Sequence, residues 1–383
     1  MSVIYGTRPE AIKTAPLVMA LRRHTELRVS VVNVGQHRES LMLIPPALRT
    51  EVDYKFDISG GLTLSAISTS AWQTVAGVLT GGTADAVVVQ GDTSVAFSSA
   101  LAALYTRTPV IHLEAGLRTW NLDSPFPEEA HRKMISGIAR LHLAPTTTAR
   151  ANLLREGLPA RDVRVVGNTS IDACRIALAA WERARSALPD ALLDDRRPIV
   201  TFTTHRRENW DRVKDFALAV GRLAAGCPGT SFVLPLHPNH LVTDVMAGAT
   251  SHLPNVHLLG PLPYDDMIRL LTRTWVLVTD SGGLQEEAAF LGVPTVVIRD
   301  TTERPEGLRA GVAVLAGTDG AVIEGLTRKL LDSPEDHRRM ARPSTCYGDG
   351  HAGEKAAGAI SEFVSGLRRT HRTPGLRGTA RGA

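Results

Sequence analysis

The 383-residue chain lacks several features that would each define a class of protein. No apolar run approaches the roughly 20 residues of a membrane-spanning helix, and the chain enters a strand at once, so we expect neither a membrane segment nor a signal peptide. Its 3 cysteines are scattered, without metal or redox spacing. Neither a dinucleotide-binding G-x-G-x-x-G nor a Walker A motif occurs. These absences predict a cytoplasmic protein with no metal and no cofactor.

The composition is that of a globular protein, with 43% hydrophobic and 21% charged residues. A net charge of +4 and a pI of about 9.1 raise the question of nucleic acid. The positive charge is spread along the chain, however, and its clearest cluster is the Gly- and Pro-containing end, residues 368–383, which reads as a disordered tail. We therefore expect no nucleic-acid partner.

Short apolar runs alternate with helical patterns almost throughout, which predicts an α/β protein with buried parallel strands. A first series of strands lies at residues 2–5, 29–34, 86–90, 110–113, 141–144 and 163–166. A helix is expected at about 171–187, and a second series of strands lies at 199–203, 231–235, 256–259, 275–279, 295–298 and 313–315. Two doubly wound domains, 1–169 and 170–351, are therefore predicted, with the ligand site between their strand ends. A last helix spans about 352–367.

The segment DSGGLQEEA, residues 280–288, joins a strand to a helix and marks the first candidate site. Ser281 suits the N-cap, and Gly282 and Gly283 allow a tight turn and a close approach to a ligand. The helix start would attract an anion, and Glu287 can accept from two ribose hydroxyls. A plain strand–turn–helix corner explains the same residues.

The segment GTRPEAIK, residues 6–13, follows the first strand. Arg8 and Lys13 both lie near the start of the next helix, where two cations oppose the helix dipole. An anionic ligand would relieve that conflict, although the same residues also suit a solvated surface.

Three carboxylates follow predicted strands of the first domain. Asp92 lies in GDT, where the pattern alone favours an N-cap; Glu114 opens EAGLRT; and Glu128 lies in the proline-fixed loop SPFPEE, where capping explains the acids equally well. Together they resemble a proton-transfer set rather than a metal set, since no histidine stands at ligand spacing.

The second domain adds a histidine and a charged loop. His205, in THRREN, can change charge near neutral pH and stands at a strand end beside two arginines, which favours a site role over a structural one. The loop RDTTERPE, residues 299–306, follows another strand and is expected to face the same cleft as the Ser281 turn. These features predict a nucleotide-diphosphate site lined by cations.

The chain resembles the bacterial, non-hydrolysing UDP-N-acetylglucosamine 2-epimerase family. GTRPEAIK, GQHRE, GDT, EAGLRT, SPFPEE, GNTSIDA, THRREN, DSGGLQEEA and RDTTERPE occur in the family's order and spacing over nearly the whole chain. The resemblance implies two Rossmann-like domains of GT-B type, with the C-terminal helix crossing back to the first. It also implies a homodimer that interconverts UDP-N-acetylglucosamine and UDP-N-acetylmannosamine by eliminating UDP and adding it again.

Carried over residue by residue, the resemblance implies roles that the sequence does not divide further. The catalytic set is Asp92, Glu114, Glu128 and His205, with His205 on the phosphate side. The substrate-binding set is Arg8, Lys13, Arg132, Met267, Ser281, Gly282, Gly283, Glu287 and Arg304.

The chain also departs from the family pattern at Trp120, at residues 40–46 and at His240. These regions resemble those where bacterial members bind a second substrate molecule as activator, which puts allosteric activation by UDP-N-acetylglucosamine in doubt rather than catalysis. Leu262 and Met267 replace more polar or aromatic residues on the uracil side. A hydrolysing 2-epimerase and a GT-B glycosyltransferase remain as alternatives.

Overall fold

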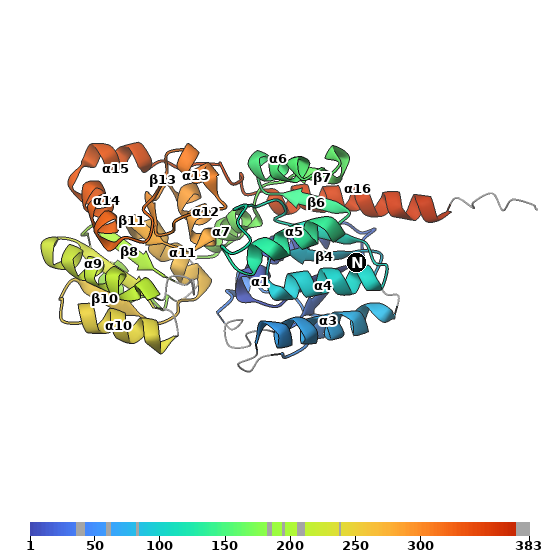
Figure 1. Cartoon of the computed structure of the whole chain (residues 1–383), viewed down its shortest axis with the longest axis horizontal. Helices are drawn as coiled ribbons and strands as arrows, with labels where there is room; N and C mark the ends of the chain where they lie inside the picture. The colour runs from blue at the N-terminus through green and yellow to red at the C-terminus, as the bar shows by residue number, and fades with distance from the viewer. Residues whose placement is uncertain are drawn as a thin grey trace, which may run out of the picture.

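The computed structural model describes residues 1–35, 43–58, 63–81, 84–181, 186–193, 196–204, 211–236 and 239–372. Two lobes lie side by side, one built on each of two parallel sheets (Figure 1). The two predicted Rossmann-like domains are thus confirmed. Within the described residues, no helix is long and apolar enough to cross a membrane.

The first lobe holds a seven-stranded sheet in the order β3-β2-β1-β4-β5-β6-β7. Its strands are β1 (Ser2–Tyr5), β2 (Ser30–Asn33), β3 (Tyr54–Lys55), β4 (Val87–Gln90), β5 (Val110–Leu113), β6 (Leu141–Ala144) and β7 (Val163–Val165). Its helices are α1 (Arg8–Leu21), α3 (Leu64–Thr80), α4 (Ser94–Tyr105), α5 (Glu128–Ile138) and α6 (Thr147–Arg155), with short 3-10 turns η1 (Pro46–Leu48) and η2 (Ala160–Asp162). Every residue of β1, β4, β5 and β6 is buried, as helices on both faces of a parallel sheet require.

The second lobe holds a six-stranded parallel sheet in the order β10-β9-β8-β11-β12-β13. Its strands are β8 (Ile199–Thr203), β9 (Ser231–Pro235), β10 (Val256–Leu259), β11 (Thr274–Thr279), β12 (Thr295–Val297) and β13 (Ala313–Leu315). Its helices are α8 (Asp190–Leu193), α9 (Val213–Gly226), α10 (His240–Thr250), α11 (Tyr264–Arg273), α12 (Gly282–Leu291), α13 (Pro305–Arg309), α14 (Gly320–Asp332) and α15 (Pro334–Met340). The predicted strands agree with the observed ones to within about a residue, because each is a short apolar run bounded by turn residues.

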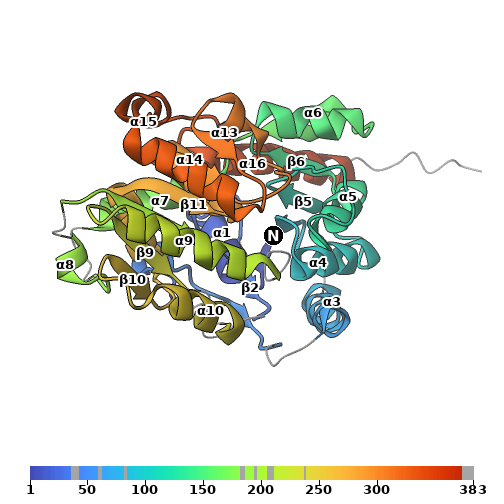
Figure 2. The ribbon, with the colours of Figure 1, turned by 60° about the vertical axis from the view of Figure 1, so that its left-hand side comes forward.

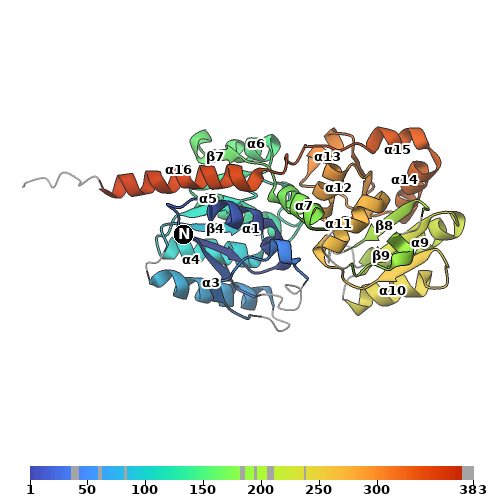
Figure 3. The same cartoon turned by 180° about the vertical axis from the view of Figure 1, so that it is seen from behind.

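Helices α7 (Thr169–Ala180) and α16 (Ala352–Arg372) connect the two lobes. Helix α7 packs against α1 and α16 as well as against α11 and α12 of the second lobe. Figure 3 shows α16 lying along the first lobe beside α1, as predicted. Two predicted ends were wrong: α7 stops at Ala180 rather than near Ala187, and α16 continues to Arg372, into the segment expected to be disordered. The exact domain boundary near residue 170 stays a prediction.

The hydrophobic core is continuous between the lobes. Leu17 and Leu21 of α1 belong to the same buried cluster as Tyr264 and Met267 of α11 and Ala288 of α12. The two lobes are therefore held together by buried apolar contact, and the expected site lies where the carboxyl ends of their strands approach this interface.

Candidate active site

The start of α1 is capped from within the chain. Thr7 and Glu10 form a capping box, and the Glu10 carboxylate also accepts from Gly6 N at 2.9 Å and from Thr93 Oγ1 at 2.5 Å. Because Thr93 is itself the N-cap of α4, this buried acid ties the ends of β1 and β4 together. Glu10 caps this helix start, whereas the cations Arg8 and Lys13 of the same segment reach other groups: Arg8 bonds to the carbonyl of Leu262, and Lys13 pairs with Glu114.

Lys13 forms a buried ion pair with Glu114. Its Nζ lies 2.5 Å from Glu114 Oε2 and 3.6 Å from Glu286 Oε2 of the second lobe. Burial opposes the lysine charge, but the two carboxylates outweigh it and hold the pKa of Lys13 above its usual value. Glu114 has a φ of +65°, a conformation that costs a non-glycine residue about 1–3 kcal/mol and that clusters at functional sites.

Arg304 joins the lobes at their buried interface. Its Nε lies 2.6 Å from Glu286 Oε1, its NH1 contacts Glu303, and its NH2 lies 3.5 Å from Glu114 Oε1. Burial disfavours this guanidinium charge, yet the three carboxylates raise the pKa of Arg304 well above its usual value. The charged loop therefore faces the same cleft as the Ser281 turn, as predicted.

The guanidinium of Arg304 also sits against the first residue of α12. A Cβ added at Gly282 would lie 2.3 Å from Arg304 NH1, whereas one added at Gly283 would meet nothing within 4 Å. Only two residues separate β11 from α12. Neither glycine has a positive φ, because both are already helical, and Gly282 allows the close approach of Arg304. Ser281 does cap α12, since its side chain accepts from Leu284 N at 3.4 Å.

Asp92 is held by Arg132 of α5. Arg132 Nε and NH2 lie 2.7 and 2.6 Å from Asp92 Oδ2, and its NH1 lies 3.1 Å from Glu129 Oε2. Burial would raise the pKa of Asp92, but the Arg132 guanidinium holds it below its usual value. The N-cap of α4 is Thr93, so the capping interpretation of Asp92 was wrong.

The two acids that open α5 have different environments. Glu129 is fully buried, and its carboxylate accepts from Thr119 N at 3.1 Å and Trp120 N at 2.9 Å, which holds the preceding loop. Glu128 is half-buried in the first turn of α5. A chain of ion pairs thus links Asp92 to Glu114 through Arg132, Glu303 and Arg304. Glu128 directly precedes Glu129, which pairs with Arg132.

Glu287 is a buried residue of α12. Tyr264 OH donates to its Oε1 at 2.8 Å, and burial raises the pKa of Glu287 to about 8. Arg8 NH2 donates to the carbonyl of Leu262 at 2.9 Å, so a group from the first lobe touches the loop that leads into α11. Met267 is only 8% exposed and belongs to the core between the lobes.

Two parts of the predicted site cannot be placed. His205 and the segment 36–39 lie outside the described residues. Conversely, the structure adds residues that the sequence patterns did not single out: Gln90, Asn168, Tyr264, Glu286 and Glu303. Several stand within or beside the quoted motifs, but only their contacts across the cleft distinguish them.

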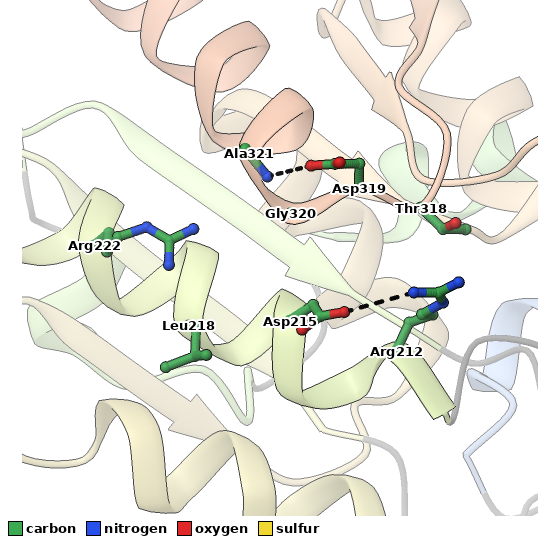
Figure 4. A pocket seen from close by; sticks show the side chains of 8 residues that line it. All are labelled: Arg212, Asp215, Leu218, Arg222, Thr318, Asp319, Gly320 and Ala321. Carbon is green, nitrogen blue, oxygen red and sulfur yellow. Dashed lines mark hydrogen bonds and ion pairs between the residues drawn. The ribbon is translucent and has the colours of Figure 1, made fainter.

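A surface hollow on the second lobe lies between α9 and the start of α14. The eight residues that line it are Arg212, Asp215, Leu218, Arg222, Thr318, Asp319, Gly320 and Ala321 (Figure 4). In the view of Figure 2, α9 and α14 run beside each other at the front of this lobe. The charges in the hollow are solvent-exposed, Arg212 NH1 lies 3.9 Å from Asp215 Oδ2, and no predicted site residue lines it. The buried cluster between the lobes is therefore the candidate active site.

Two Rossmann-like lobes with cations and acids at their facing strand ends define a GT-B-type nucleotide-sugar fold. The sequence profile of the UDP-N-acetylglucosamine 2-epimerase family matches residues 19–361. A UDP-N-acetylglucosamine 2-epimerase of Neisseria meningitidis is 39% identical, over 91% of this chain and 95% of that protein. One of Bacillus subtilis is 38% identical, over 92% of each chain.

A solved structure agrees with the sequence comparisons. The UDP-GlcNAc 2-epimerase from Neisseria meningitidis, bound to UDP-GlcNAc, superposes with a TM-score of 0.90 at 37% identity, covering 94% of this chain and 100% of that one. The chain belongs to the UDP-N-acetylglucosamine 2-epimerase family.

Proposed function

We propose that this protein interconverts UDP-N-acetylglucosamine and UDP-N-acetylmannosamine without net hydrolysis. The observation that carries the proposal is the buried cluster in which Arg304 and Lys13 join Glu114 of one lobe to Glu286 of the other. Family membership and the UDP-GlcNAc in the Neisseria meningitidis structure support the choice of substrate.

The chemistry explains why both acids and cations are needed. The proton on C2 of the sugar is not next to a carbonyl, so simple enolisation is not available. Removing that proton while the C1–O bond to UDP breaks gives a 2-acetamidoglucal, and UDP then adds to C1 as C2 takes a proton on the opposite face. This route needs a base, an acid and cations for the departing diphosphate.

The acid and base roles fall to the carboxylates of the first lobe. Glu114 and Asp92 follow neighbouring strands and are joined through the charged cluster, and Glu128 opens the helix that carries Arg132. The Arg132 guanidinium holds the pKa of Asp92 below its usual value, and Lys13 forms an ion pair with Glu114. We assign proton transfer to Asp92, Glu114 and Glu128 as a set, with His205 on the phosphate side.

The diphosphate is assigned to the opposite wall. Ser281, Gly282 and Gly283 open α12, whose N-terminus favours negative charge, and Arg8, Lys13 and Arg304 supply the cations. In the described structure Arg304 is neutralised by Glu286 and Glu303. A bound diphosphate would pair with Arg304 in place of these carboxylates. Binding would therefore not bury an unpaired charge on the ligand. Glu287 would accept from the ribose.

Proton NMR of UDP-N-acetylglucosamine incubated with the protein in D2O tests the reaction. Deuterium at C2 in a mixture of intact gluco and manno nucleotide sugars is expected. Release of UDP with free N-acetylmannosamine would instead favour the hydrolysing alternative. Absence of both exchange and product would point to a different sugar, a missing activator or a GT-B glycosyltransferase, and the last of these is tested with added acceptor sugars.

Variants test the residue roles. Glu114→Gln and Asp92→Asn are each expected to abolish C2 exchange while UDP still binds, measured by calorimetry. Glu335→Gln is a matched control, because its carboxylate is 83% exposed on α15. Full activity in either site variant would refute the assignment of that acid.

The family resemblance further supports a cytoplasmic homodimer, which light scattering on the purified protein would test. Activation by a second UDP-N-acetylglucosamine molecule stays an open prediction that a substrate-saturation curve addresses, since a sigmoidal curve would show it.

A further inference from the structure

Most of the donors that hold the Glu114 carboxylate lie on one of its two oxygens. Oε2 accepts hydrogen bonds from Lys13 Nζ at 2.5 Å, Gln90 Nε2 at 3.1 Å and Asn168 Nδ2 at 3.2 Å. Oε1 accepts only a longer one, from Arg304 NH2 at 3.5 Å, among the described residues. A carboxylate oxygen offers about two lone pairs, so Oε2 is saturated and Oε1 is the oxygen left for a reacting proton.

Asn168 is the donor whose own position is most constrained. It lies at the crossover between the lobes, is 2% exposed and is the N-cap of α7. Its Oδ1 accepts from Ser170 N at 3.0 Å, so the amide group can present only its NH2 to Glu114.

The backbone of Asn168 is fixed by the segment that returns to the first lobe. Asn168 N donates to Tyr347 O at 2.7 Å. The approach depends on glycine: Gly348 has a φ of +141°, and a Cβ there would lie 3.1 Å from Asn168 N. Both chain crossings between the lobes therefore meet at this one residue, the returning one at its backbone N–H.

The same returning segment reaches Arg304. Tyr347 OH donates to the carbonyl of Arg304 at 3.0 Å and accepts from Gly307 N at 2.9 Å. The crossover thus holds both the carboxylate and the cation that face each other across the cleft.

We infer that Asn168 is a positioning residue, which orients the Glu114 carboxylate so that Oε1 faces the substrate proton. The inference rests on the proposed role of Glu114 in proton transfer. Asn168 itself does not touch the substrate, and it acts through its hydrogen bond to Oε2.

Two substitutions separate this role from simple helix capping. Asn168→Asp and Asn168→Ser both retain a good N-cap, so a capping role predicts wild-type behaviour for both. A positioning role predicts instead that kcat falls in both variants, and further in Asn168→Asp than in Asn168→Ser. Serine is too short to reach Glu114, and aspartate replaces the donor by an anion facing the carboxylate.

We expect kcat for epimerisation to fall about 10- to 100-fold in Asn168→Ser, because a hydrogen bond to a charged group is lost, and further in Asn168→Asp. KM and the affinity for UDP should stay within about twofold of wild type, since Asn168 lies on the carboxylate side. Asp319→Ala, which removes the surface N-cap of α14, is the control: it should lower Tm and leave kcat unchanged. Wild-type kcat in Asn168→Asp would overturn the inference.

A crystal structure of Asn168→Ser provides a readout that needs no turnover. The Glu114 carboxylate is expected to rotate away from its position between Lys13 and Gln90, while α7 still begins at Thr169. An unmoved carboxylate would overturn the inference even if the wild-type protein epimerised its substrate. A rotated carboxylate in a protein without C2 exchange would leave the positioning intact and count against the proposed function alone.

Discussion

Replacing Glu287 by glutamine should stabilise the protein, and more so at higher pH. Burial raises the pKa of Glu287 from 4.5 to about 8. In the unfolded chain the group ionises near its ordinary value, so the folded state holds a proton that the unfolded state releases. The contribution of Glu287 to stability is therefore largest below pH 4.5, declines as pH rises toward 8, and is constant above.

The magnitude follows from the two pKa values. Each unit of difference is worth about 1.4 kcal/mol, so keeping this carboxyl buried costs about 3 kcal/mol at pH 7 and about 5 kcal/mol above pH 8. Glutamine has the same shape, carries no charge, and its carbonyl still accepts from Tyr264 OH. The unfolding entropy of about 2.1 cal/mol/K per residue gives, for a chain of 383 residues, about 1 °C in Tm per kcal/mol, so the gain in Tm should reach several degrees at high pH.

Calorimetric melting of wild type and Glu287→Gln from pH 5 to pH 8.5 tests this reasoning. The difference in Tm should be near zero at pH 5 and grow steadily to pH 8. Glu335→Gln, at an exposed position, should show a flat difference. A Glu287→Gln variant that is less stable, or equally stable at every pH, would refute the argument. UDP affinity should fall in the same variant above pH 8, where the wild-type group is a carboxylate, because a carboxylate accepts more strongly from ribose hydroxyls than an amide does.

The remaining predictions concern the cations of the cleft. Gly282→Ala should lower kcat/KM by at least about tenfold, because the new Cβ displaces the Arg304 guanidinium. A Cβ at Gly283 meets open space, so Gly283→Ala should leave Tm unchanged or raise it slightly. Activity equal in the two variants would contradict this. Arg132→Met should destabilise the protein by about 3–5 kcal/mol at pH 7, because it leaves buried carboxylates unpaired. Since Arg132 depresses the pKa of Asp92, its contribution is present above pH 3.8 and is lost as pH falls below, so urea unfolding curves of the two proteins should converge in acid.

The sequence by itself determined the order of strands and helices and the edge at which the site forms. Buried parallel strands such as Val87–Gln90 must be short apolar runs, and the polar residues that follow them must gather at one edge. For that reason Asp92, Glu114 and Ser281 could be singled out without a structure. The nine motifs in order also predicted the family, which the comparisons confirmed.

Only the tertiary structure decided which charges pair. Arg304 and Glu114 are 190 residues apart, and no local pattern says that they meet. Pattern alone favoured Asp92 as an N-cap, but packing of α5 placed Arg132 against it and left capping to Thr93. The sequence patterns did not single out Asn168, and only the crossover between the lobes places its amide against Glu114. Local propensity is read from neighbours in the chain, whereas these contacts depend on how two separately wound sheets are docked, and that docking is set by apolar packing far from the charges themselves.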